Sequence, residues 1–132
     1  MRYLLDTNIV IAAIQQHPKV LSRLTQTPLS RIVMSSIVLG ELQFGATKSR
    51  HAAQNLANLQ QCTKGMQMLD VDALSSASYA QIRHQLEAQG QMIGANDLWI
   101  AAQAVAHDCI LVTHNRREFD RVDGLRCEDW VG

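Results

Sequence analysis

MRYLLDTNIV, at residues 1–10, joins a short apolar run to an acidic residue, Asp6, and then to a second apolar run. Tyr3 to Leu5 has no polar interruption, which is typical of a strand whose sheet is covered on both faces. Asp6 or Thr7 can cap a helix over residues 8–16. The segment therefore predicts a strand that leads directly into a helix, with a carboxylate at their junction.

Strands and helices alternate along the rest of the chain. Further strands are predicted at residues 31–35, 66–71 and 109–113, with a short one at 125–127. Further helices are predicted from Pro18 toward Pro28, from Ser35 or Ser36 through Glu41, and over residues 52–62, 72–89 and 96–107. This alternation indicates an α/β fold in three layers, with helices on both faces of a mainly parallel sheet of four to five strands.

The bulk composition limits the classes of protein that fit. A length of 132 residues, with 47% hydrophobic and 18% charged residues, suits a single globular domain over residues 1–132. The 12 basic and 12 acidic residues cancel, so the total field of the protein does not favour non-specific coating of nucleic acid.

Cysteine usage and apolar runs indicate a cytoplasmic protein. The three cysteines form no CxxC pair, so the sequence predicts neither a disulfide framework nor a zinc site. Asp6 interrupts what would be the apolar core of a signal peptide, and no apolar run approaches the length of a membrane span. We therefore expect no membrane association.

Isolated acidic residues stand at the boundaries of these predicted elements. Asp6 follows the first strand, Glu41 lies in SSIVLGELQFG (35–45) and Asp97 lies in IGANDLWIAAQA (93–104). Each has a structural explanation: Asp6 as a helix cap, Glu41 on a solvated face, and Asp97 at a favourable helix start with Asn96 as its cap. Ligands bind beyond the carboxyl ends of parallel strands, however, and this is where the three would meet.

Carboxylates brought together in this way need a cation to offset their repulsion. Mg²⁺ or Mn²⁺ prefers oxygen ligands, activates bound water and attracts phosphate, which are the needs of phosphodiester cleavage. The chain has no HExxH, P-loop or GxSxG motif that would indicate zinc, nucleotide or serine chemistry instead.

Four motifs carry a family resemblance that covers nearly the whole chain. LLDTNIVI, SSIVLGELQFG, IGANDLWIAAQA and ILVTHNRREFDRV, in this order, resemble a PIN-domain ribonuclease, and more narrowly a VapC-type toxin of a bacterial type II toxin–antitoxin pair. The resemblance implies a PIN-like fold and Mg²⁺- or Mn²⁺-dependent endoribonuclease activity. It also implies a homodimer, a cognate antitoxin that occupies the acidic pocket, and operator DNA bound only through that antitoxin.

The resemblance also implies roles for the acidic residues. Asp6, Glu41 and Asp97 match the main acidic positions of the family; Asp6 and Asp97 would bind the metal, and Glu41 would complete the shell or orient the attacking water. Many relatives have an Asp where this chain has Asn115, and Glu118 is the nearest carboxylate that can replace it. Either Asn115 or Glu118 can fill the fourth position. The number of bound ions is one or two, and one ion fits the smaller number of charges better.

Several other residues are weaker candidates for a functional role. Thr7, Thr113, Asn115 and Arg116 are candidates for the pocket or for substrate contact. Trp99 is expected in core or dimer packing, and Trp130 is expected to anchor the carboxyl terminus. Residues 48–59 resemble the part of the family that forms a clip against the antitoxin.

Two alternatives fit the same coarse pattern. A response-regulator receiver has a similar length and would use Asp70 or Asp72 as its phosphoacceptor, but it leaves Asp97 without a role. A catalytically inactive PIN-type binding module would explain Asn115, although Asp6, Glu41 and Asp97 favour activity. The expected substrate is a structured RNA, cleaved in an exposed loop of a transfer or ribosomal RNA where single-stranded bases are accessible.

Overall fold

The computed structural model describes residues 1–132 and contains one sheet of five parallel strands. The strands are β1 (Arg2–Leu5), β2 (Ile32–Ser35), β3 (Gln67–Leu69), β4 (Cys109–Val112) and β5 (Cys127–Glu128). Their order across the sheet is β3-β2-β1-β4-β5, so β1 is central, with Leu4 opposite Val33 on one side and Leu111 on the other. The predicted parallel sheet is confirmed.

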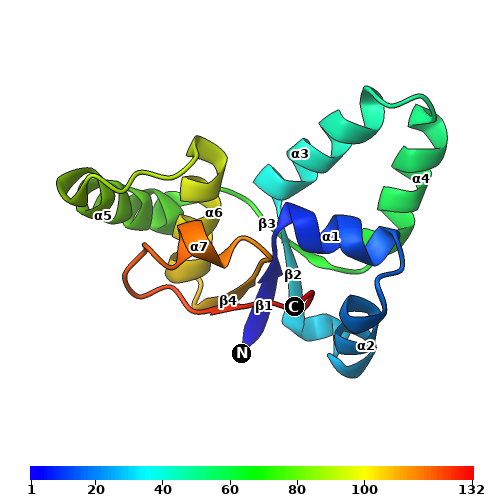
Figure 1. The fold of residues 1–132 in the computed structure, drawn as a ribbon, viewed down its shortest axis with the longest axis horizontal. Coiled ribbons are helices and arrows are strands. Elements are labelled where there is room, and N and C mark those ends of the chain that lie inside the picture. Colours follow the sequence, from blue (N-terminus) through cyan, green and yellow to red (C-terminus); the bar gives the residue numbers. More distant parts are fainter.

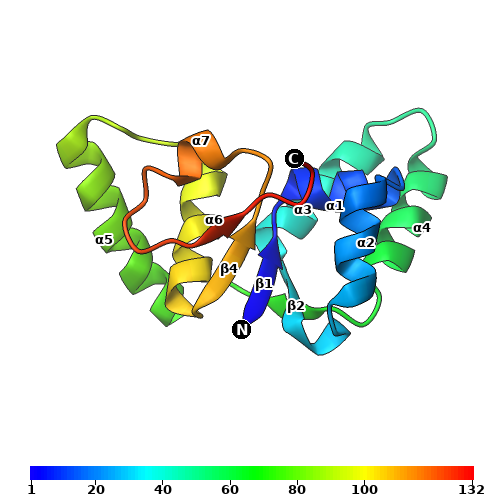
Figure 2. The same ribbon diagram turned by 60° about the horizontal axis from the view of Figure 1, so that its bottom comes forward.

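Helices cover both sides of this sheet, as expected for a three-layer fold. Figures 1 and 2 show α1 to α4 on one side and α5 and α6 on the other. The helices are α1 (Thr7–Ile14), α2 (Pro18–Gln26), α3 (Ser36–Thr47), α4 (Ala52–Thr63), α5 (Ala73–Gln89), α6 (Ala95–Ala106) and α7 (Arg116–Phe119), with a 3₁₀ turn η1 (Leu29–Arg31). None of them combines the length and apolar character that crossing a bilayer requires.

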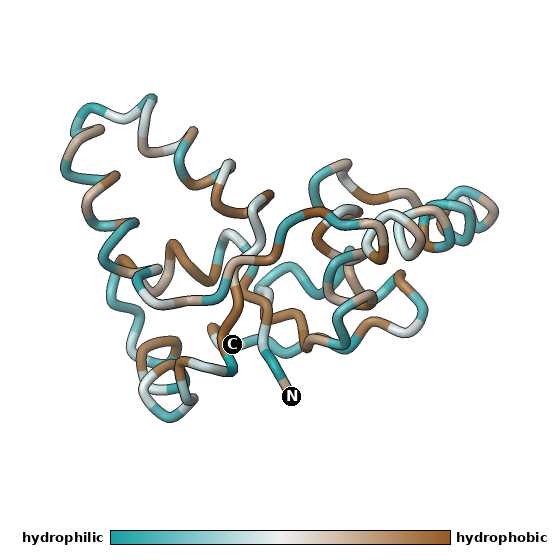
Figure 3. Tube along the Cα trace, turned by 180° about the vertical axis from the view of Figure 1, so that it is seen from behind, coloured by the Kyte–Doolittle hydropathy of each residue, from teal (hydrophilic) through white to brown (hydrophobic).

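The core lies between the sheet and the two helical layers. Leu4, Val33 and Leu111 of the three central strands are fully buried, as are Ile100 of α6 and Phe119 of α7. The Cα tube in Figure 3 is accordingly hydrophobic along the central strands. Burial on both faces explains why the strand sequences are continuously apolar rather than alternating.

Local side-chain chemistry sets the helix starts. Asp6 caps α1 by accepting from the Thr7 amide at 2.8 Å, Ser35 caps α3 through the Ile37 amide at 3.0 Å, and Asp72 caps α5 through the Ser75 amide at 2.8 Å. The expectation that Asn96 caps α6 is wrong, since the helix already begins at Ala95 with Gly94 as its cap.

Other boundaries differ from the predictions by a few residues. Helix α1 ends at Ile14 rather than Gln16, because Gln16 adopts a left-handed backbone (φ 62°) that cannot continue the helix. Arg31 belongs to η1 instead of β2, and β3 stops at Leu69. Helix α7 was not predicted at all, since its four residues carry no repeating apolar pattern.

The strand order excludes the receiver alternative. A receiver of the flavodoxin-like type has the order 2-1-3-4-5, whereas this sheet has the order 3-2-1-4-5. Asp70, one of the two acids offered as a phosphoacceptor, is exposed at the end of an edge strand, and Asp72 caps α5.

Candidate active site

Four carboxylates from four different elements gather beyond the carboxyl ends of the central strands. Asp6 ends β1, Glu41 lies in the second turn of α3, Asp97 lies in the first turn of α6, and Glu118 lies in α7 after β4. Burial raises the pKa of Asp97, and the negative charges of Asp6, Glu118 and Glu41 raise it further, so the four groups share one site. The structure thus brings together the four acidic residues that the sequence singled out for the metal-dependent site.

Asp6 is the most buried of these acids, with 4% of its surface exposed. Its Oδ2 accepts a hydrogen bond from Thr113 Oγ1 at 2.7 Å, and its Oδ1 accepts from the Thr7 amide at 2.8 Å. Burial raises the pKa of Asp6, and the bonds from Thr113 and Thr7 oppose that rise. Asp6 is therefore held in place by one donor directly after β4 and one at the start of α1.

Asn8 is a site residue that the sequence analysis missed. Its Nδ2 donates to Asp6 Oδ2 at 3.4 Å, and its Oδ1 accepts from the His114 amide at 3.1 Å. Asn8 thereby connects Asp6 to the loop that follows β4. Its place two residues after Asp6, at the start of α1, was the available signal, but the same place also suits an ordinary residue of a helical first turn.

Glu41 lies beside Thr7 at the junction of α1 and α3. Burial is the main cause that raises the pKa of Glu41, followed by the charge of Asp6, while the Thr7 hydroxyl lowers it. Neither Glu41 Oε1 nor Thr7 Oγ1 has a hydrogen-bond partner of good geometry, although both atoms are buried. Two buried oxygens without partners at an acidic site are available to a ligand.

Asp97 has the most perturbed ionisation in the chain. Burial, the charge of Asp6, a hydrogen bond with Glu118 and the charges of Glu118 and Glu41 together raise the pKa of Asp97 to about 7. Its Oδ2 lies close to the backbone of Gly94, where an added Cβ would stand 3.6 Å away. Burial and the neighbouring negative charges therefore favour the protonated form of Asp97.

Asn115 and Glu118 lie in contact after β4. The Asn115 amide nitrogen of the backbone donates to Thr113 Oγ1 at 3.0 Å, and its side-chain Nδ2 donates to Glu118 Oε2 at 3.3 Å. Glu118 is also the carboxylate of this segment that lies near Asp97. Arg116 is exposed, and its Nη2 lies 3.6 Å from Asp120 Oδ1.

The donor set suits a hard divalent cation. All the candidate ligands are oxygens, and the unpartnered Glu41 Oε1 lies among them. No three Asp, Glu, His or Cys side chains are close enough together to hold an ion between them as they stand. Mg²⁺ needs only one or two carboxylates and keeps several waters, so the residues present fit such an ion.

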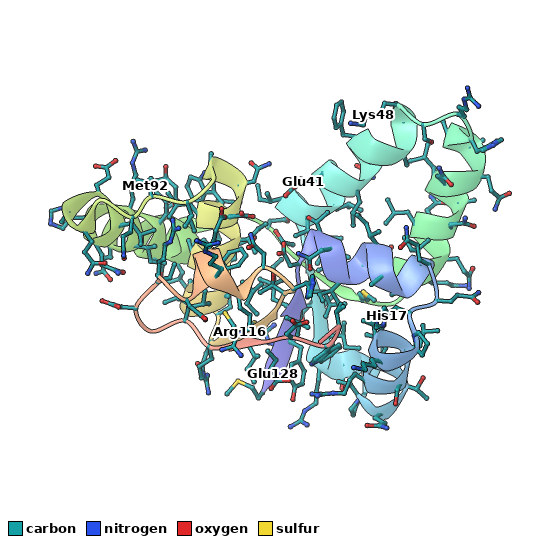
Figure 4. All side chains as sticks on the ribbon, in the orientation of Figure 1. His17, Glu41, Lys48, Met92, Arg116 and Glu128 are labelled. Atoms are coloured by element: carbon teal, nitrogen blue, oxygen red, sulfur yellow. The ribbon has the colours of Figure 1, made fainter.

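Two hollows flank Glu41. One, of about 390 Å³, lies between α1, α3 and α4 and is lined by apolar groups such as Ile11, Leu42 and Leu59, with Thr7 and Glu41 at its edge. The other, of about 370 Å³, lies between α3 and α6 and is lined by Ser36, Ile37, Gly40, Glu41, Phe44 and Asn96. Figure 4 shows Glu41 on the part of α3 nearest α6, with Lys48 at the far end of that helix.

The two tryptophans take the positions expected of them. Trp99 stacks on Tyr79 of α5 with ring centroids 3.8 Å apart, which is packing between helices. Trp130 is buried against Tyr3 and lies under the Arg23 guanidinium, so it anchors the end of the chain as predicted.

Comparison with known proteins agrees with this fold. Residues 3–125 match the PIN domain family. The chain is 41% identical to "Ribonuclease VapC2" of Haemophilus influenzae over 99% of both chains, and 38% identical to "tRNA(fMet)-specific endonuclease VapC" of Shigella flexneri over 98% of both. Among solved structures it is similar to VapBC2 of Rickettsia felis bound to a promoter DNA fragment, with 40% identity, a TM-score of 0.91, and coverage of 98% of this chain and 99% of that one.

The chain is an α/β domain with four carboxylates beyond the carboxyl ends of its parallel strands. It is a member of the PIN-domain family. Within that family, full-length identities of about 40% group it with the VapC ribonucleases.

Proposed function

We propose that this protein is a metal-dependent endoribonuclease that acts as the toxin of a toxin–antitoxin pair. The observation that carries the proposal is the convergence of four carboxylates in one place, where burial and the charges of the other three raise the pKa of Asp97 to about 7. Such a repulsive cluster has a cost in folding stability, and a cation removes that cost. The VapC names of the relatives at about 40% identity support the same activity.

Each acidic residue has a distinct proposed role. Asp6 and Asp97 hold Mg²⁺ or Mn²⁺, and Glu41 completes the shell or, through its unpartnered Oε1, orients the attacking water. Glu118 adds the fourth negative charge, and Asn115 holds it in place. When bound, the ion lowers the pKa of water and neutralises charge on the scissile phosphate.

The proposed substrate is a loop of a transfer RNA. A relative 38% identical over nearly the full length is named for the initiator transfer RNA, which favours this choice over ribosomal RNA. Loop bases are unpaired and accessible, and Arg116 and Arg117 are exposed on α7 beside Glu118, where they can contact phosphates.

The proposed partner is a cognate antitoxin that covers the acidic site. The apolar hollow between α1, α3 and α4 opens beside Thr7 and Glu41, so one segment can fill it with apolar side chains and place a basic side chain at the carboxylates. Structures of DNA-bound VapBC complexes from two relatives support an assembly in which the antitoxin carries the operator DNA. We propose a homodimer as the toxin unit of that assembly.

Cleavage of total RNA by antitoxin-free protein tests the proposal. Wild type and Asp6→Asn are compared in the presence of Mg²⁺, Mn²⁺ or EDTA, with Asp123→Asn as the matched control because Asp123 is exposed and outside the acidic cluster. We expect discrete metal-dependent cuts from wild type and Asp123→Asn, and a loss of about 100-fold or more in Asp6→Asn, as for other catalytic groups. Folded wild type that cuts no RNA with either metal would instead identify an inactive binding module.

A further inference from the structure

Gln103 is a fully buried polar residue that the proposed chemistry does not use. It lies in α6 among apolar neighbours, with 0% of its surface exposed. Burying an amide in such surroundings is unfavourable unless all its hydrogen-bonding groups are satisfied. Its partners therefore indicate what it contributes.

The Gln103 side chain joins three elements. Its Nε2 donates to the carbonyl oxygen of Leu69, the last residue of β3, at 3.0 Å, and its Oε1 accepts from the Ser35 hydroxyl. Because the Leu69 carbonyl can only accept, the amide nitrogen must face it, which leaves the amide oxygen facing Ser35. The orientation of the side chain is thus fixed by chemistry.

Ser35 extends this connection to α3. Its hydroxyl gives its hydrogen to Gln103, so a lone pair remains for the Ile37 amide, 3.0 Å away, at the start of α3. Ser35 and Leu69 are paired in register at the ends of β2 and β3. Gln103 therefore connects α6 to the point where α3 leaves the sheet.

Each of the two connected helices carries one carboxylate of the site. Each carboxylate lies the same number of residues along the chain from the side chain that makes the connection. Glu41 lies six residues after Ser35 on α3, and Asp97 lies six residues before Gln103 on α6. Six helical residues span about 9 Å. Over that length a tilt of about 6° in either helix moves its carboxylate by about 1 Å, and errors of that size can reduce rates about 100-fold.

We infer that Gln103 is a positioning residue that sets the placement of Asp97 relative to Glu41 by tying α6 to the Ser35 cap of α3 and to the end of β3. This inference rests on the proposed metal-dependent function. Gln103 touches no carboxylate in the site, so it acts only through the placement of the two helices.

Gln103→Met is the informative variant, because Met has a similar length and helix propensity but makes neither hydrogen bond. Gln85→Met is the matched control: Gln85 also makes two hydrogen bonds to another part of the chain, donating to the Arg121 carbonyl and accepting from the Asp123 amide, but it bonds neither α3 nor α6. Calorimetry measures Mn²⁺ binding to the metal-free, antitoxin-free protein, and kinetics separate kcat from KM.

We expect Gln103→Met to weaken Mn²⁺ binding and to lower kcat by about 10- to 100-fold each, the range for residues that orient metal ligands. KM for RNA should change less than about twofold, and Gln85→Met should keep wild-type values. A Gln103→Met protein with wild-type Mn²⁺ affinity and kcat would overturn the inference, as would equal losses in Gln85→Met at matched stability.

Ser35 variants keep the test decisive if Gln103→Met does not fold. Ser35→Ala removes the link to α3 but leaves the Gln103–Leu69 bond, so it should weaken Mn²⁺ binding. Ser35→Thr keeps a hydroxyl and should bind Mn²⁺ about as well as wild type. A folded Ser35→Ala protein with unchanged affinity would contradict the inference. If wild type itself neither binds Mn²⁺ nor cuts RNA, the proposed function fails. Hydrogen exchange then still tests the positioning role: amides in the first turn of α6 should exchange faster in Gln103→Met than in Gln85→Met.

Discussion

Thr113 opposes the effect of burial on the ionisation of Asp6. Its hydroxyl donates to Asp6 Oδ2 and also accepts from the Asn115 amide, so one buried side chain serves two site residues. Replacing it by Val removes both bonds and leaves the amide unsatisfied, at a cost of about 1–3 kcal/mol in the free energy of unfolding.

Thr113→Val should raise the pKa of Asp6 further, because only burial and the Thr7 bond would then act on it. The acidic limb of the pH profile of cleavage should therefore move to higher pH than in wild type. The measurement is the pH dependence of kcat/KM beside Thr113→Ser, which retains the hydroxyl. Identical profiles for Thr113→Val and wild type would show that Thr113 does not act on Asp6.

The raised pKa of Asp97 predicts that the free energy of unfolding increases as the pH falls. Its folded-state pKa of about 7 lies above the ordinary value of 3.8, so between these values the folded protein binds more protons than the unfolded chain. The free energy of unfolding of the metal-free protein should therefore rise as the pH falls from about 8 toward 5. Because Asp97 is partly solvated, the gain is discounted to about 1 kcal/mol, or about 3–5 °C in Tm.

Asp97→Asn should be more stable than wild type at pH 8 without metal, should lose this pH dependence, and should not cleave RNA. Thermal unfolding at several pH values, with and without Mn²⁺, measures these effects. Asp123→Asn, at an exposed acid outside the cluster, is the control. A Tm in Asp97→Asn that follows the wild-type pH curve would show that another group dominates it.

At the scale of elements, α1, α3 and α4 form one apolar surface beside the site. Ile11 of α1 lines the hollow between them and is 42% exposed, so it is available to a partner without supporting the core. Burying an Ile side chain contributes about 1.5–3 kcal/mol, which corresponds to about 10- to 100-fold in affinity.

Ile11→Ser should weaken binding of the antitoxin by about that factor while RNA cleavage stays near the wild-type rate. Calorimetric titration with the antitoxin measures this affinity. Leu29→Ser is the control, since Leu29 is 51% exposed in η1, which leads into the amino-terminal end of β2, whereas the site lies beyond the carboxyl ends of the strands. Equal affinities for Ile11→Ser and wild type would place the antitoxin elsewhere.

At the scale of the whole molecule, the cancelling charges govern how RNA is bound. Twelve basic and twelve acidic residues give no net field, and the acidic site repels phosphate until a cation is bound. Few phosphate contacts remain, so the logarithm of RNA affinity should fall with the logarithm of salt concentration with a slope of only about −1 to −2.

Binding of a transfer RNA in 50–300 mM salt, with Mn²⁺ and the inactive Asp6→Asn protein, measures that slope. Cuts in total RNA should be confined to defined loops, because shape and accessible bases select the site rather than charge. A steep slope, or degradation of all RNA at similar rates, would show that non-specific charge attraction dominates.

Much of the fold could be predicted because its signals are local. The apolar strand 3–5 and the caps at Ser35 and Asp72 depend on neighbouring residues, so pattern and cap chemistry were sufficient. Helix α7 and the left-handed Gln16 could not be predicted, because a four-residue helix and a single backbone angle leave no periodic signal.

The sequence by itself determined the alternation of strands and helices and the acidic residues at their junctions, since both follow from side-chain chemistry along the chain. Only the tertiary structure decided that β1 lies between β2 and β4, that Asn8 and Thr113 hold Asp6, and that Gln103 meets Ser35. The physical reason is that these contacts join residues up to 107 positions apart, and their geometry depends on how the layers pack.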